Sequence, residues 1–256
     1  MTQLTRRTFF EAFAGAAALH AIMASGALAS PPADLNRWAQ DVADLNRALA
    51  AGKIPLLGWQ EQITALNTGV SLDALRRYLD FDRLTAAMTF PTNLAETKDP
   101  KFPQAVNIAG IERPWFLRFF GMRKGGAIIP HVHNNMVSSH LVMQGAFRTR
   151  TFDRVADLPA ENAVLLKPTL DQTLSAGGMI TMSDDRTNGH WLIAEADRSF
   201  TFDVGLVNLS KTRTYAMQAN KYNMIFVDPT GKADGRGLVA APVISFEGAV
   251  AKFAAQ

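Results

Sequence analysis

Cysteine is absent from all 256 residues, so no disulfide can stabilise the fold and the compartment must be inferred from other features. Neither sign of charge is in large excess, because 26 basic residues nearly balance 23 acidic ones. No dense basic patch interleaved with aromatic residues is present, which argues against nucleic acid as a partner. After residue 29, no apolar run approaches the length that spans a membrane. Internal repeats and low-complexity tracts are absent too.

Histidine is the rare residue whose placement is informative: the chain has five. His131 and His133 alternate in a stretch that begins at Gly125 and ends at Gly145. Alternate side chains of an extended strand share a face, so these two imidazoles can bind one divalent metal. His190 follows several expected short strands later, where the chain can return to the same site.

This pattern resembles a known family, the cupins. Gly125, His131-x-His133 and Gly145 resemble the first cupin motif, and the segment from Gly178 to His190 resembles the second. The resemblance covers roughly residues 105 to 210 and implies a mainly β fold, a double-stranded β-helix or jelly-roll barrel, here behind N-terminal α-helices.

The position of the usual cupin glutamate ligand holds Ser138. Among cupins, this loss resembles the thiol dioxygenases of the cysteine and cysteamine dioxygenase group, which hold non-haem iron on three histidines. The resemblance therefore implies Fe²⁺ on His131, His133 and His190, with Zn²⁺, Mn²⁺ or Ni²⁺ as alternatives. It implies O₂ and a small thiol or enolate as partners.

Three neutral imidazoles leave the full charge of a bound ion in place, which favours an anionic substrate. A non-haem iron oxygenase of a small anionic molecule is the first expectation. A periplasmic cupin that binds a metal or a small molecule without turnover is the alternative, and metal-dependent isomerisation or hydrolysis is a third possibility. A zinc site with a bound water also fits three histidines.

Two polar residues stand in strands that otherwise consist of core residues. His140 shares the parity of Ser138, and Asp203 lies in the apolar run from Phe200 to Leu209. We predict that they face the pocket as catalytic groups, or as partners of a ligand histidine, of substrate or of each other. The structural alternative places both on the outer face of the barrel, under the N-terminal helices.

Other candidates follow from charge and from the resemblance. Any one of Arg113, Arg118 and Arg123 could hold a substrate carboxylate, although each is more typical of a surface. Asp184 and Asp185 lie in an expected turn, where aspartate is common. The pocket tyrosine of cysteine dioxygenases has no counterpart between Thr201 and Leu209, and whether Tyr215 or Tyr222 reaches the pocket is open. A cysteine–tyrosine crosslink is excluded, because its cysteine position holds Ser138.

The N-terminus resembles a twin-arginine export signal. Thr5 to Phe10 contain Arg6-Arg7, an Ala/Gly-rich apolar segment follows, and Ala27-Leu28-Ala29 is typical of a cleavage site. We expect export through the twin-arginine machinery to the periplasm, cleavage before Ser30 and no stable membrane anchor, although an uncleaved anchor is the alternative.

The remaining chain divides into two expected parts. Residues 30–95 are predicted to be helical and to pack on the barrel, with apolar stripes before Gly52 and Gly69 and an N-cap at Ser71. Residues 100–256 are predicted to form the cupin barrel, with a turn-rich loop between residues 149 and 168 and a short helix from residue 246. The oligomeric state is open.

Overall fold

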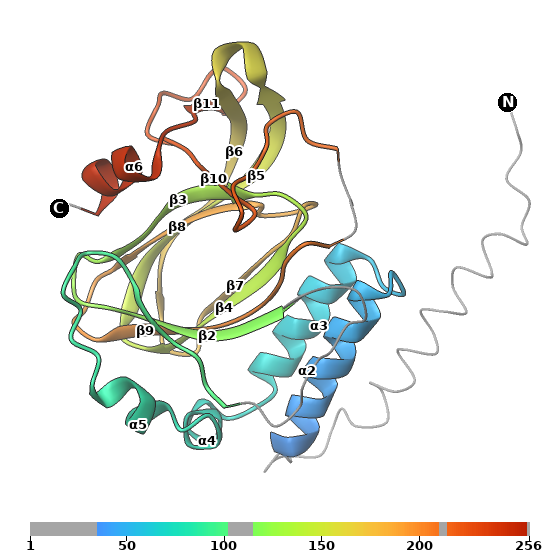
Figure 1. Ribbon diagram of the computed structural model, residues 1–256, viewed down its shortest axis with the longest axis vertical. Coiled ribbons are helices and arrows are strands. Elements are labelled where there is room, and N and C mark those ends of the chain that lie inside the picture. The colour runs from blue at the N-terminus through green and yellow to red at the C-terminus, as the bar shows by residue number, and fades with distance from the viewer. Residues whose placement is uncertain (1–34, 102–114, 210–213, 255–256) are drawn as a thin grey trace, which may run out of the picture.

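The computed structural model describes residues 35–101, 115–209 and 214–254. The expected signal segment, its cleavage site and Arg113 lie outside these ranges. Helices come first, strands follow, and one helix closes the described chain (Figure 1). The helices are α2 (Leu35–Ala50), α3 (Leu56–Thr68), α4 (Leu72–Tyr78), α5 (Phe81–Ala86), the 3₁₀ turn η1 (Pro159–Glu161) and α6 (Phe246–Phe253). None of these helices is long and apolar enough to cross a membrane.

Two antiparallel sheets curl around a common interior (Figure 1). The five-stranded sheet has the order β1-β2-β9-β4-β7 and the six-stranded sheet the order β10-β3-β8-β5-β6-β11. The strands are β1 (Glu96–Lys98), β2 (Trp115–Met122), β3 (Ala127–His133), β4 (Val137–Gln144), β5 (Ala146–Leu158), β6 (Ala163–Ser175), β7 (Met179–Met182), β8 (Gly189–Ala194), β9 (Ser199–Leu206), β10 (Met224–Phe226) and β11 (Val239–Pro242). The alternation of strands between two sheets is that of a double-sheet jelly roll, so the predicted fold class is confirmed.

The N-terminal helices cover the outer face of the five-stranded sheet (Figure 1). Helix α2 buries the apolar stripe that its sequence predicts, and the Ser71 hydroxyl accepts a hydrogen bond from the Ala74 amide at the start of α4. Aromatic rings connect the two layers: the centroid of Phe81 lies 5.2 Å from that of Phe200 on β9. The helices therefore seal one side of the barrel with a continuous apolar core.

This core fixes which residues of β9 and β4 face the interior. Phe200, Phe202 and Val204 point towards the helices, so the residues between them point into the barrel. The same alternation on β4 turns Ser138 and His140 inward. The predicted pocket-facing orientation of His140 and Asp203 is therefore the observed one, and the outer-face alternative is wrong.

The expected loop between residues 149 and 168 is the main difference from the sequence-based secondary structure. Strands β5 and β6 run through most of it, and the turn is confined to η1 and Asn162. The long hairpin escapes the sequence pattern because two irregularities, at Thr151/Phe152 and Arg154/Ala156, break the alternation of apolar residues.

Candidate metal centre

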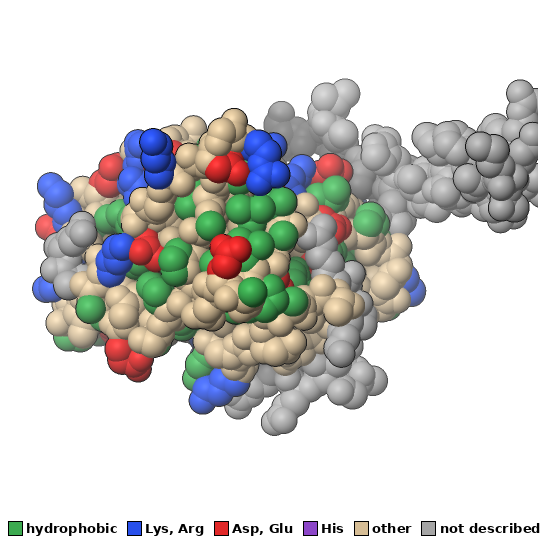
Figure 2. Space-filling model, turned by 90° about the horizontal axis from the view of Figure 1, so that it is seen from above, with side chains coloured by type: hydrophobic (Ala, Val, Ile, Leu, Met, Phe, Trp, Pro, Cys, Tyr) green, Lys and Arg blue, Asp and Glu red, His purple; other side chains and the backbone are tan. Residues whose placement is uncertain are grey.

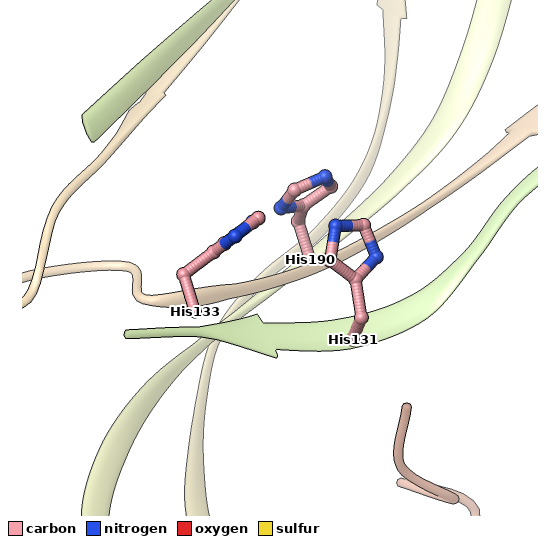
Figure 3. Close-up of side chains that lie close together, drawn as sticks. All are labelled: His131, His133 and His190. Carbon is pink, nitrogen blue, oxygen red and sulfur yellow. The ribbon is translucent and has the colours of Figure 1, made fainter. Parts of the chain in front are cut away.

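Three histidines converge inside the barrel. His131 and His133 come from β3, and His190 comes from β8, where it lies directly opposite His131 in the antiparallel pair. Their rings point towards one another (Figure 3), and one potential ligand atom from each lies within 4.8 Å of the others. The side chains are deeply buried, and no histidine is visible on the face shown in Figure 2. The sequence-predicted triad is therefore assembled in space.

Hydrogen bonding leaves nitrogen lone pairs for a ligand. His131 Nδ1 lies 2.8 Å from the Ile129 carbonyl, to which it donates, so Nε2 carries a lone pair. His190 Nδ1 has no hydrogen-bond partner among the described residues. Neither ring nitrogen of His133 makes a well-formed hydrogen bond there, although the Asn223 backbone lies close enough to favour its protonated form. Buried polar atoms without partners are costly, and a metal cation would satisfy them.

The electrostatics also fit a metal ion. Burial lowers the pKa of His131 to about 4, and burial followed by repulsion from neighbouring histidines lowers the pKa values of His133 and His190 well below their ordinary range. All three imidazoles are therefore neutral at pH 7, the state in which histidine binds metals.

A network of polar side chains holds the backbone of His133. The Asn188 side chain accepts a hydrogen bond from the His133 amide at 3.1 Å and donates one to its carbonyl at 3.1 Å. Arg154 Nη1 donates to the same carbonyl at 2.9 Å. Arg154 is 5% exposed, pairs with Asp157 at 2.6 Å and lies 4.0 Å from the centre of the Tyr215 ring. These contacts fix the end of β3 that carries His133, a candidate metal ligand.

Sequence reasoning missed Arg154. It shares its parity along β5 with Arg148 and Arg150, which are half-exposed and pair with Asp171. The bulge at Thr151/Phe152 turns the later residues of the strand to the other face, so Arg154 becomes buried. Asn188 lies in the turn before β8, and its role could have been suspected only from its position two residues before His190.

A row of polar residues crosses the five-stranded sheet beside the triad. Arg118, Asp203 and His140 are direct neighbours on β2, β9 and β4. His140 Nδ1 lies 2.5 Å from Asp203 Oδ2, and both side chains are buried. Burial raises the pKa of the Asp203 carboxyl, and His140 opposes that shift most strongly. The His140 ring centre lies 4.8 Å from that of His190, which places the pair next to the candidate ligands.

The histidines form the deep end of a cavity of about 410 Å³. Ser138 lines it with a buried hydroxyl that has no hydrogen-bond partner among the described residues, so this part of the wall beside the triad carries a neutral group. Arg118 also lines the cavity, but its guanidinium is bound by both carboxylate oxygens of Asp99, at 2.6 and 2.9 Å. Tyr222 lines the entrance.

The other candidate residues lie elsewhere. Arg123 donates to the Asn93 side chain at 2.8 Å and does not line the cavity. Asp184 accepts from the Asn135 amide and Asp185 lies in the same turn, in keeping with their expected structural role. Tyr215 packs against Arg154 instead of lining the cavity.

Comparisons with known proteins identify no family for this sequence: no protein-family model and no curated protein matches it. Similar solved structures exist. KdgF from Halomonas sp. is 15% identical, with a TM-score of 0.31 over 46% of this chain and 81% of that chain. A cupin superfamily protein from Desulfitobacterium hafniense DCB-2 is 11% identical, with a TM-score of 0.32 over 49% and 88%. A recombinant oxalate oxidase in complex with glycolate is 13% identical, with a TM-score of 0.32 over 50% and 57%. Likeness at this level does not extend to an activity.

Proposed function

We propose that His131, His133 and His190 hold a divalent transition-metal ion, with Fe²⁺ as the first choice, and that the protein is an oxygenase of a small anionic molecule. One observation carries this proposal: three neutral, buried imidazoles meet at the deep end of a cavity, and two of them have ring nitrogens without a hydrogen-bond partner among the described residues. When bound, such an ion supplies a Lewis-acidic and redox-active centre.

The chain's own residues favour an anion beside that centre. Ser138 occupies the cavity wall where a glutamate would add negative charge, and the three imidazoles carry no charge of their own. No carboxylate among the proposed ligands therefore offsets the positive charge of a bound ion. An anionic substrate would supply the missing compensation.

His140 and Asp203 are suited to hold a proton next to the substrate. Nδ1 and Oδ2 lie 2.5 Å apart without the angles of a regular hydrogen bond, and a proton held between them would stabilise this contact. This arrangement fixes the His140 ring and leaves Nε2 as the nitrogen that can accept a proton or a hydrogen bond from a molecule in the cavity.

Oxygen uptake tests the proposed reaction. Iron-loaded protein is mixed with a panel of thiols and 1,3-diketones, and consumption of O₂ with at least one of them, lost in His131→Ala with His133→Ala, is the expected result. Full iron loading without uptake for any member of the panel would contradict the oxygenase and favour the metal-binding cupin without turnover.

We also propose that residues 1–29 direct export of the protein to the periplasm. The paired Arg6 and Arg7 before an apolar segment support this proposal. Replacing both by lysine is expected to keep the precursor in the cytoplasm. A native N-terminal sequence that begins at Met1 would contradict cleavage before Ser30.

A further inference from the structure

The polar side chains of the cavity gather at its deep end and at its entrance. The buried part of its lining contains the histidine triad, Ser138, His140 and Asp203. The walls between this end and the entrance are mainly apolar, with Phe116, Phe120, Ile128, Met224 and Phe226 half-buried around the free space. Phe246, 46% exposed, and Tyr222, 59% exposed, stand at the entrance. The rest of a ligand that reaches the histidines must therefore contact mainly aromatic and aliphatic side chains.

The size of the cavity points the same way. Its volume of about 410 Å³ falls in the range that encloses most of the surface of a drug-sized ligand. A molecule of two or three carbon atoms would leave most of the apolar wall in contact with water, and the free energy of burying that wall would not contribute to its binding.

The charges of the lining distinguish a monoanion from a zwitterion. Asp203 is the one carboxylate among the described lining residues, and it is occupied by His140. The charge of Arg118 is offset by Asp99. Lys221 stands at the entrance, exposed, with its Nζ 5.0 Å from the centre of the Tyr222 ring and no carboxylate paired to it in the part of the chain that the structure describes. A ligand ammonium would find no free anionic partner, whereas Lys221 attracts anions to the entrance.

From these observations we propose that the substrate class is an apolar monoanion: an anionic head at the histidines and an aromatic or branched aliphatic body along the walls, without an ammonium group. This inference rests on the proposed function for the position of the head. It deepens that function because it excludes small zwitterionic thiols such as amino acids and selects hydrophobic thiolates, enolates or carboxylates.

Three matched probes test the class by calorimetric titration of the full chain as purified with its metal. 3-Phenylpropionate carries ring and anion, propionate lacks the ring, and L-phenylalanine adds an ammonium. We expect 3-phenylpropionate to bind most tightly, with loss of the ring weakening binding roughly 10- to 100-fold. The added ammonium should weaken it by at least about tenfold. Equal affinity for propionate, or tighter binding of L-phenylalanine, would overturn the class.

Matched variants locate the effect. Phe226→Ser should weaken the binding of 3-phenylpropionate roughly tenfold and leave the binding of propionate unchanged, because only the ring of the ligand contacts the wall. If Phe226→Ser lowers the melting temperature, Phe246→Ser at the entrance gives the same comparison with less risk to folding. Val155→Ser, 50% exposed and outside the cavity lining, is the control. If Phe226→Ser and Phe246→Ser weakened the binding of both probes equally, the apolar part of the ligand would not lie along these walls.

Metal content of the same samples separates this inference from the proposed function. Selectivity for 3-phenylpropionate by protein that cannot bind metal would refute the oxygenase and support the apolar class. A full metal site that prefers L-phenylalanine would refute the apolar class and leave the metal function standing.

Discussion

At the scale of single residues, the contact between His140 and Asp203 is the strongest indication of a chemical role. Both side chains are buried, they are direct neighbours on adjacent strands, and they lie beside a candidate metal ligand. A purely structural pair at this place would be costly, because burying two ionisable groups carries a desolvation penalty that their attraction only partly returns. We therefore interpret the pair as a functional feature.

Asp203→Asn should lower turnover roughly 10- to 100-fold while metal content is retained, because the amide keeps the shape of the side chain but no longer holds the His140 proton in place. Oxygen uptake per folded, metal-loaded molecule measures the effect. Asp171→Asn, which removes a half-exposed carboxylate paired with Arg148 and Arg150 outside the cavity lining, is the matched control. Unchanged turnover with a lower melting temperature would reduce the pair to a structural role.

Sequence alone located the triad and the inward direction of His140 and Asp203, because the alternation of a regular strand fixes the face of each side chain. It could not establish that His140 and Asp203 touch, since that depends on the register between β4 and β9. Nor could it show that Arg118, which lines the cavity, is already bound by Asp99 from a segment 19 residues earlier.

Among the elements, strand β5 and its bulges have the largest consequence for the site. The irregularity at Thr151/Phe152 brings Arg154 inside, where it joins the His133 carbonyl to Asp157 and to the segment around Met217. Asp157 accepts from the Met217 amide at 2.8 Å, so one ion pair supports both the strand of the candidate ligands and the segment that leads to the cavity entrance. Periodicity cannot predict such an arrangement, because a bulge reverses parity without a distinctive sequence signal.

Arg154→Met should destabilise the fold by about 3 to 5 kcal/mol, because it leaves the Asp157 carboxylate buried without its partner. The double variant Arg154→Met with Asp157→Leu should recover part of that loss. Arg148→Met, which breaks a half-exposed pair with Asp171, should cost no more than about 1 kcal/mol. Denaturant unfolding measures all three variants, and equal losses in Arg154→Met and Arg148→Met would contradict the buried role.

For the molecule as a whole, the N-terminal helices and the two sheets enclose an interior with three neutral histidines. The helical stripes and the jelly-roll class are visible in the sequence because helix and strand periodicities differ. Strands β10 and β11 were not predicted, although β10 pairs with β3 directly at His131 and His133. They are short, and their pairing is set by long-range contacts that local pattern does not encode.

The stability of metal-free protein should depend on pH through these histidines. Their folded pKa values lie below the unfolded value near 6.5, with His131 at about 4, so the unfolded chain binds more protons between these limits. The contribution of these histidines to the free energy of unfolding is therefore complete above pH 6.5, and it decreases as the pH falls from 6.5 towards 4. Denaturant unfolding of chelated protein at several pH values checks this, and a flat profile across that window would contradict burial of neutral imidazoles.

Metal analysis of protein purified without chelator tests the triad most directly. We expect about one transition-metal ion per chain, and its loss from His131→Ala with His133→Ala, because one remaining imidazole is too weak a site. If the double variant folds and carries the same metal content as the unaltered protein, the triad is not the metal site.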